Sequence, residues 1–151
     1  MKGRIFILGL ICLTVILGCR GRGETRQTEQ ASDNRECIQN FTYQGSFMSG
    51  RTFKTHQLVR NVSKSDAVER AARHIAKSGW HIKTIDKDIG VISAEQTVSF
   101  GKGKTAPLNV TVEPVQEGVK VSLSFSISGG ESVRGGALQN GFCSIIEAIE
   151  K

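Results

Sequence analysis

The sequence has 151 residues, of which 38% are hydrophobic, 23% charged and 6% aromatic, and its formal net charge is +6. These values are typical of one globular domain, and they exclude a disordered chain, a collagen and a protein with several membrane spans. The positive charge alone is compatible with nucleic-acid binding.

The first 18 residues have the pattern of a secretory signal peptide. Lys2 and Arg4 precede an apolar block at residues 5–17, and Gly18 closes that block. A basic start, an apolar stretch of roughly 7–15 residues and a small residue before the cut define such a peptide. A membrane-spanning helix needs about 20 apolar residues, so we predict that residues 1–18 are removed on export.

The end of this block resembles the lipobox of bacterial lipoproteins. In Ile16-Leu17-Gly18-Cys19 an aliphatic residue and a small residue precede the cysteine, as in that family. The resemblance implies that Cys19 carries a thioether-linked diacylglycerol and an N-linked acyl chain such as palmitate. Two or more acyl chains hold a protein stably on a membrane. The alternative is ordinary secretion with a free Cys19.

The residue after the lipobox bears on the membrane in which the protein resides. In bacterial lipoproteins an Asp at this position favours retention in the inner membrane, and here the position is held by Arg20. The resemblance therefore implies the cell outer membrane, with the domain facing the periplasm, rather than the inner membrane or the cell surface.

A polar stretch separates the lipobox from the rest of the chain. Residues 20–36 contain one apolar side chain, that of Ala31, and no proline. Such a stretch buries too little surface to fold, so residues 19–36 are predicted to be the lipidated cysteine and a flexible tether to a single domain at residues 37–151. Removal of residues 1–18 leaves 18 basic and 14 acidic residues, a net charge of +4. Export excludes nucleic acid as a partner, and we expect an anionic envelope surface instead.

Two cysteines remain once Cys12 leaves with the signal peptide and Cys19 is acylated. In an oxidising compartment the pair Cys37 and Cys143 predicts a disulfide. A bridge that closes a loop of about 100 residues stabilises a fold by on the order of 4–5 kcal/mol. The alternatives are two buried free thiols or a metal site, although two cysteines without a nearby pair of histidines do not form a zinc tetrahedron.

The domain is predicted to be α+β, with an antiparallel sheet of four to five strands and two helices packed on one face. The clearest signal is the alternation of apolar and polar residues at 119–128. Ser63 is a predicted N-cap, with Asp66 in the capping-box position. The predicted order is β-α-β-β-β-β-α, with strands at 51–60, 80–85, 91–99, 108–115 and 119–128 and helices at 64–78 and 138–149.

The segment from Ala67 to Ala94 resembles the opening of small envelope lipoprotein domains, a group that includes the C subunit of the outer-membrane β-barrel assembly machine. Shared features are a helix, the Gly79-Trp80 start of a strand, an Asp-containing turn at residues 86–88 and the Gly-x-Ile-x-Ala pattern of residues 90–94. The resemblance implies a scaffold-like role and no catalytic residues.

Catalytic and metal-binding patterns are weak in this sequence. His56, His74 and His81 share no ligand spacing. Ser132 stands where a nucleophile elbow would have its serine, but Arg134 replaces the second glycine of that motif. We interpret Ser132 as a helix cap, and the Gly129-Gly130 amides as weak candidates for holding an anion.

One face of the helix at 64–78 is basic. Arg70, Arg73, His74 and Lys77 share that face by their spacing. A phosphate site is one interpretation of this pattern, and we favour a solvated face.

These observations predict a non-enzymatic lipoprotein that is anchored to the membrane, that binds or scaffolds an envelope protein, and that has no cofactor or metal. The alternative is a periplasmic carrier of a small ligand or lipid, with a pocket between the C-terminal helix and the sheet. Gly135, Gly136 and Gly141 would leave space for that pocket, although close helix packing explains them equally. An envelope hydrolase that uses Ser132 is a third alternative.

Overall fold

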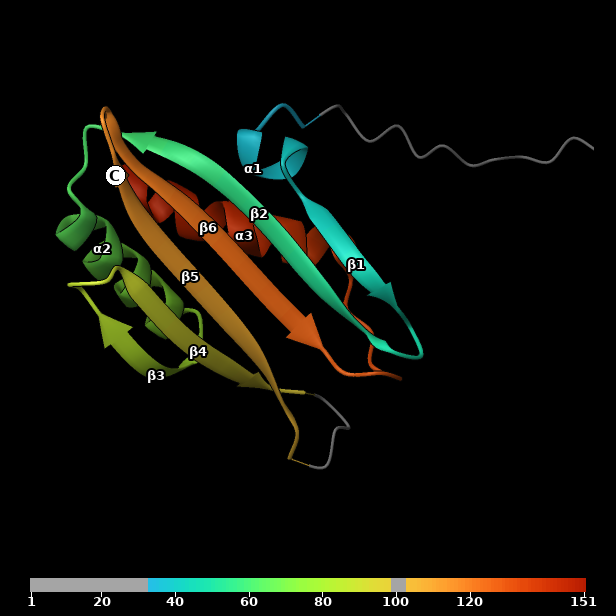
Figure 1. The fold of residues 1–151 in the computed structure, drawn as a ribbon. Coiled ribbons are helices and arrows are strands. Elements are labelled where there is room, and N and C mark those ends of the chain that lie inside the picture. Colours follow the sequence, from blue (N-terminus) through green and yellow to red (C-terminus); the bar gives the residue numbers. More distant parts are fainter. Residues whose placement is uncertain (1–32, 99–102) are drawn as a thin grey trace, which may run out of the picture. The chain divides into compact units, whose positions relative to one another are not determined.

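A computed structural model describes residues 33–98 and 103–151, and it contains one antiparallel sheet with helices against it (Figure 1). The α+β class and the antiparallel sheet are therefore confirmed. The predicted signal peptide, the lipobox, Cys19 and most of the tether lie outside the described residues. The elements in chain order are α1 (Glu36–Gln39), β1 (Thr42–Ser46), β2 (Gly50–Arg60), α2 (Lys64–Lys77), β3 (His81–Asp86), β4 (Val91–Thr97), β5 (Thr105–Val115), β6 (Gly118–Ile127) and α3 (Gly135–Glu150).

The predicted element count was too low. The described residues form six strands and three helices, because α1 and β1 precede the first predicted strand. With four residues, α1 is too short to show helical periodicity. All five residues of β1 are exposed, so this strand has no alternation of apolar and polar residues to reveal it.

The sheet has the strand order β1-β2-β6-β5-β4-β3, which places β6 near its centre. The longest pairing joins β2 to β6, from Arg51 opposite Ile127 to Arg60 opposite Gly118. The predicted alternation of β6 is confirmed, since the side chains of Val119, Val121, Leu123, Phe125 and Ile127 are all buried. These side chains face the helices, and the opposite face of the sheet is open.

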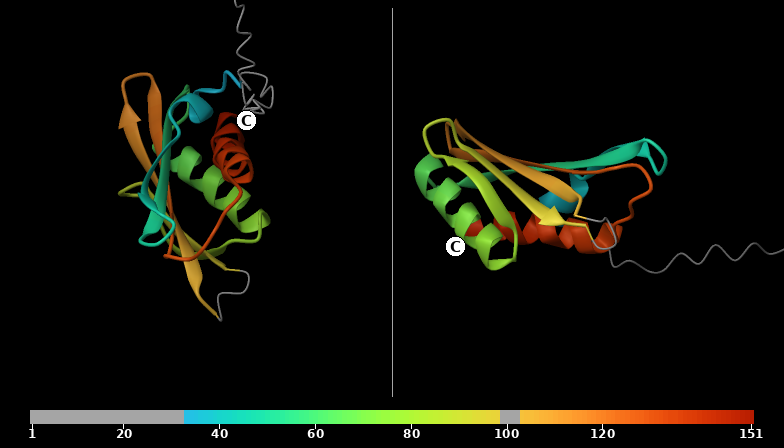
Figure 2. Two further views of the ribbon diagram at one scale, coloured as in Figure 1. Left: turned by 90° about the vertical axis from the view of Figure 1, so that its right-hand side faces the viewer. Right: turned by 90° about the horizontal axis from the view of Figure 1, so that it is seen from below.

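Two longer helices cover the buried face of the sheet (Figure 2). As predicted, Ser63 caps α2: its Oγ accepts a hydrogen bond from the Asp66 amide at 3.1 Å. The helix buries a stripe of mostly small side chains, at Ala67, Val68, Ala71, Ala72 and Ile75. Small side chains let α2 pack close to the sheet.

The helix α3 runs beside α2 in the opposite chain direction. Arg70 Nη1 donates a hydrogen bond to the Ile149 carbonyl oxygen at 2.8 Å, and His74 Nε2 lies 3.2 Å from Ser144 Oγ. Earlier residues of α2 thus lie against later residues of α3. Within the part of the chain that the structure describes, no helix is both long and apolar enough to cross a membrane.

Candidate binding surfaces

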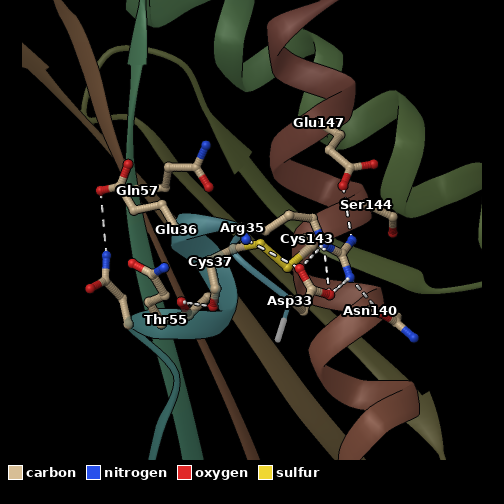
Figure 3. The surroundings of a disulfide bond; sticks show 12 residues. Asp33, Arg35, Glu36, Cys37, Thr55, Gln57, Asn140, Cys143, Ser144 and Glu147 are labelled. Atoms are coloured by element: carbon tan, nitrogen blue, oxygen red, sulfur yellow. Dashed lines mark hydrogen bonds and ion pairs between the residues drawn. A yellow bond between two sulfur atoms is a disulfide. The ribbon is translucent and has the colours of Figure 1, made fainter. Parts of the chain in front are cut away.

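A disulfide bond joins the beginning of the domain to its last helix (Figure 3). Cys37 in α1 and Cys143 in α3 are 106 residues apart in the sequence, and their Cα atoms lie 5.5 Å apart. Both residues are buried, with exposed fractions of 2% and 0%. The predicted disulfide is therefore confirmed, and the alternatives of free thiols and a metal site are excluded for this pair.

Arg35 holds the first described residues against α3 (Figure 3). Its guanidinium donates hydrogen bonds to Glu147 Oε1 at 3.0 Å and to Asn140 Oδ1 at 2.7 Å. It also forms an ion pair with Asp33 at 2.6 Å. The hydrogen bonds that Arg35 donates to Asp33 and then to Glu147 raise the pKa of Arg35, and the contact with Asp33 lowers the pKa of Asp33. The chain therefore begins its folded part beside α3.

A groove of about 410 Å³ lies between α2 and α3. Four residues from α2 line one side: Arg70, Arg73, His74 and Lys77. The other side is lined by Ser144, Glu147, Ala148 and Lys151. Both sets have the spacing i, i+3, i+4, i+7, which places them on one face of each helix. We predicted the α2 set from the sequence, and we missed the α3 set although its spacing is the same.

The basic face of α2 is less solvated than we predicted. Arg73 and Lys77 are exposed, but Arg70 and His74 are half-buried against α3. The Ser144 hydroxyl next to His74 donates a hydrogen bond to the Gly141 carbonyl oxygen at 2.8 Å. Contacts with the second helix therefore fix part of this face in place.

A second hollow, of about 260 Å³, lies between α3 and the sheet. Its lining is mainly apolar and includes Trp80, Leu108, Phe125, Phe142 and Ile145. Gly141 also lines it, and a Cβ atom added there would meet nothing within 4 Å. The same holds for Gly135 and Gly136, so close helix packing does not explain these glycines in the folded domain.

The open face of the sheet, which faces the viewer in Figure 1, is polar. One row of opposed residues crosses all six strands and consists of Thr42, Lys54, Ser124, Asn109, Ser93 and Thr84. Within the row, Ser93 Oγ donates a hydrogen bond to Asn109 Oδ1 at 3.0 Å. A depression of about 310 Å³ on this face includes the basic side chains of Lys54, His56 and Lys120.

The interpretation of Ser132 as a helix cap was wrong. The N-cap of α3 is Arg134, which makes no side-chain capping bond, and Ser132 is exposed in the preceding loop. Gly130 does not offer a free amide to an anion either, because its N–H donates to the Phe47 carbonyl oxygen at 2.8 Å. The loop between β6 and α3 therefore supports the β1–β2 turn.

The three histidines lie in different parts of the fold. His56 is on the open face of the sheet, His74 is between the helices, and His81 begins β3. Among residues 33–98 and 103–151, no three His, Cys, Asp or Glu side chains lie close enough together to hold a metal ion.

Similarity to known proteins is found among solved structures. No family model matches the chain, and no curated protein sequence matches it. The crystal structure of protein CV1439 from Chromobacterium violaceum is similar with a TM-score of 0.35 and 14% sequence identity. The match covers 66% of this chain and 94% of that chain.

Proposed function

We propose that the chain is a lipoprotein of a bacterial envelope that is anchored through Cys19 and acts by binding or scaffolding a protein partner rather than by catalysis. The observation that carries the proposal is the lipobox at residues 16–19, placed directly after a basic start and an apolar block. The disulfide between Cys37 and Cys143 supports export, since such bonds form and persist in oxidising compartments.

The fold supplies a surface for such a partner. The open sheet face has small polar side chains on six hydrogen-bonded strands, so it presents many donors and acceptors on a rigid base. Lys54 and Lys120 add positive charge to this face. An envelope protein with an acidic and polar surface is the partner whose chemistry fits.

The anchor is tested by acyl labelling in cells that produce the full chain. We expect labelled palmitate on the wild-type chain, accumulation of the unprocessed form with globomycin, and no label on a Cys19→Ala variant. Label that persists in Cys19→Ala would contradict the anchor. The outer membrane is tested by fractionation, with Arg20→Asp as the matched variant that should shift the protein to the inner membrane.

The binding role is tested by crosslinking in intact cells, followed by mass spectrometry. Reproducible capture of one envelope protein by the wild-type chain, lost in Lys54→Glu/Lys120→Glu, would support scaffolding through the open face. Capture that is unchanged by this double variant would place the partner elsewhere on the domain.

The second candidate is a carrier of a small apolar ligand, and one specific observation favours it. Gly141 leaves open space in the hollow beneath α3, although a glycine inside a helix costs about 1 kcal/mol relative to alanine. The probe is the neutral dye N-phenyl-1-naphthylamine. We expect its fluorescence to rise with the wild-type chain and Gly136→Leu, and not with Gly141→Leu, which fills the hollow. No rise with the wild-type chain would overturn the carrier.

A further inference from the structure

The groove between α2 and α3 has an excess of positive charge. Four cationic side chains line it, those of Arg70, Arg73, Lys77 and Lys151, and Glu147 is the acidic side chain among the lining residues. Arg35 forms an ion pair with that carboxylate at 3.0 Å, although it shares its charge with Asp33 at 2.6 Å. The groove is therefore suited to an anion.

The cations differ in how they are held. Arg70 donates to the Ile149 carbonyl oxygen at 2.8 Å, and Arg73 forms an ion pair with Glu69 at 2.7 Å. Neither Lys77 nor Lys151 forms an ion pair with a residue that the structure describes. Arg70 is thus held in place before any ligand arrives, which lowers the entropy it loses on binding. Arg73 shares its charge with Glu69 in an exposed pair, and the two lysines remain available to a ligand.

The chemistry of these side chains favours a phosphate group. Guanidinium groups hold phosphate oxygens through paired hydrogen bonds, and lysines add point charges. Ser144 also lines this groove, and its hydroxyl donates to the Gly141 carbonyl oxygen. The groove is partly open to solvent, so a phosphate that projects from a surface can reach it.

The proposed anchor would bring one source of phosphate near the groove. Arg35, near the beginning of the described chain, contacts Glu147, which itself lines the groove. If Cys19 is acylated, 14 residues join the anchor to Asp33, and a flexible segment of that length spans roughly 20 Å. A tether of that length would keep the domain, including its helical side, within reach of the bilayer that holds the anchor.

We infer that the groove between α2 and α3 docks on the phosphate headgroups of anionic lipids in the membrane to which the chain is anchored. The inference rests on the proposed function, because the tether brings the groove to the membrane. Docking turns the helices toward the lipid, and it leaves the open face of the sheet directed away from the membrane, toward a protein partner.

The contact between the groove and the lipid can be measured by the reactivity of a thiol placed in the groove. In the acylated chain Cys19 is blocked and Cys37 is bonded to Cys143, so Ala148→Cys introduces the single free thiol on a residue that lines the groove. The protein is reconstituted in phosphatidylcholine vesicles, with or without phosphatidylglycerol. The reaction rate with a neutral, water-soluble maleimide is then compared for the two lipid compositions.

We expect phosphatidylglycerol to slow the reaction at least about fivefold, which is the effect of one cation close to an anionic surface. In the same background, Lys77→Glu/Lys151→Glu should abolish the difference between the two compositions. Lys54→Glu/Lys120→Glu reverses the same number of charges on the open sheet face and should preserve that difference. The inference would be overturned if the Ala148→Cys protein reacted at the same rate on both kinds of vesicle. It would also be overturned if both double variants reduced the effect of phosphatidylglycerol equally.

Two further arms separate the outcomes. Inorganic phosphate added to phosphatidylcholine vesicles should leave the rate unchanged; slowing equal to that by phosphatidylglycerol would mean that the groove takes a free anion, against the inference. The intact mass of the same preparation reports acylation of Cys19. In a chain without acyl groups Cys19 is a second free thiol, so the adduct at residue 148 is followed separately by peptide mass spectrometry. A response of residue 148 to phosphatidylglycerol in that chain would contradict the anchor and support anion binding by the groove itself.

Discussion

The hydroxyl of Thr55 donates a hydrogen bond to the carbonyl oxygen of Cys37 at 2.6 Å. Thr55 lies in β2 and is 3% exposed, so its Oγ1 joins the sheet to α1 inside the core, next to the disulfide (Figure 3). A buried carbonyl that loses its donor has no water to replace it.

Removal of the Thr55 hydroxyl should destabilise the domain. We expect Thr55→Val to lower the free energy of unfolding by about 1–3 kcal/mol, since it keeps the size of the side chain and leaves the Cys37 carbonyl unsatisfied. The measurement is urea denaturation. Thr52→Val is the control, because the Thr52 hydroxyl bonds Ser126 Oγ on the open face, where water can take its place. Equal losses in the two variants would contradict the role of Thr55.

The disulfide should contribute more than any single hydrogen bond. It closes a loop of 106 residues, so Cys37→Ser/Cys143→Ser is expected to lower the free energy of unfolding by about 4–5 kcal/mol. Urea denaturation of the wild-type and doubly substituted chains measures the difference. Because both sulfurs are buried, a reductant should act on the wild-type protein only as fast as the domain opens. Rapid reduction of the folded protein would argue against this burial.

Two glycines with positive φ provide a matched pair of substitutions. Gly90 has φ +78°, and a Cβ atom there would lie 2.3 Å from the Val112 carbonyl oxygen. Gly79 has φ +82°, with nothing within 4 Å. Gly79→Ala should therefore lower the free energy of unfolding by only about 1–2 kcal/mol, because alanine must adopt the left-handed conformation there. Gly90→Ala should lower the free energy of unfolding by about 1–3 kcal/mol more than Gly79→Ala, because strand β5 must also shift. Thermal denaturation of both variants measures the difference, and equal losses would contradict it.

Glu69 should make stability depend on acidity. The hydrogen bond from Lys87 and the nearby charge of Arg73 lower the pKa of this carboxyl group, and the Lys87 Nζ lies 3.0 Å from Glu69 Oε2. A group whose pKa is lowered by folding stabilises the protein above its unfolded pKa, about 4.3 for Glu. That contribution is lost as the pH falls through the folded pKa.

Glu69→Gln should therefore destabilise the protein at neutral pH, and the difference from the wild type should vanish at acidic pH. Urea midpoints measured from neutral pH down to about pH 3 would reveal this convergence. The control is Glu113→Gln, since Glu113 is exposed and forms no ion pair with any described residue. A difference that stays constant over the whole pH range would exclude this role for Glu69.

The parts of the fold that could be predicted are those in which one residue pattern decides the structure. β6 buries every second side chain, and Ser63 with Asp66 caps α2 through bonds between near neighbours. The short α1 and the fully exposed β1 have no such pattern. They form because tertiary contacts hold them, namely the disulfide and the pairing with β2.

The groove was only half predictable for the same reason. The spacing of Arg70, Arg73, His74 and Lys77 places them on one helical face, and this local inference was correct. Which element lies opposite that face depends on packing of the whole domain. The sequence contains the matching spacing of Ser144, Glu147, Ala148 and Lys151, but nothing local places the two helices side by side.

The pairing of β2 with β6 governs when the domain can form. β2 ends at Arg60, and its central neighbour β6 begins only at Gly118. A nascent chain that stops before residue 118 has β2 paired on one side only, by the five-residue β1. Contacts between residues so distant in sequence give a high contact order, and such domains fold slowly. The sheet can therefore be completed only once β6 has been synthesised, and we expect β2 to lack its inner neighbour until then.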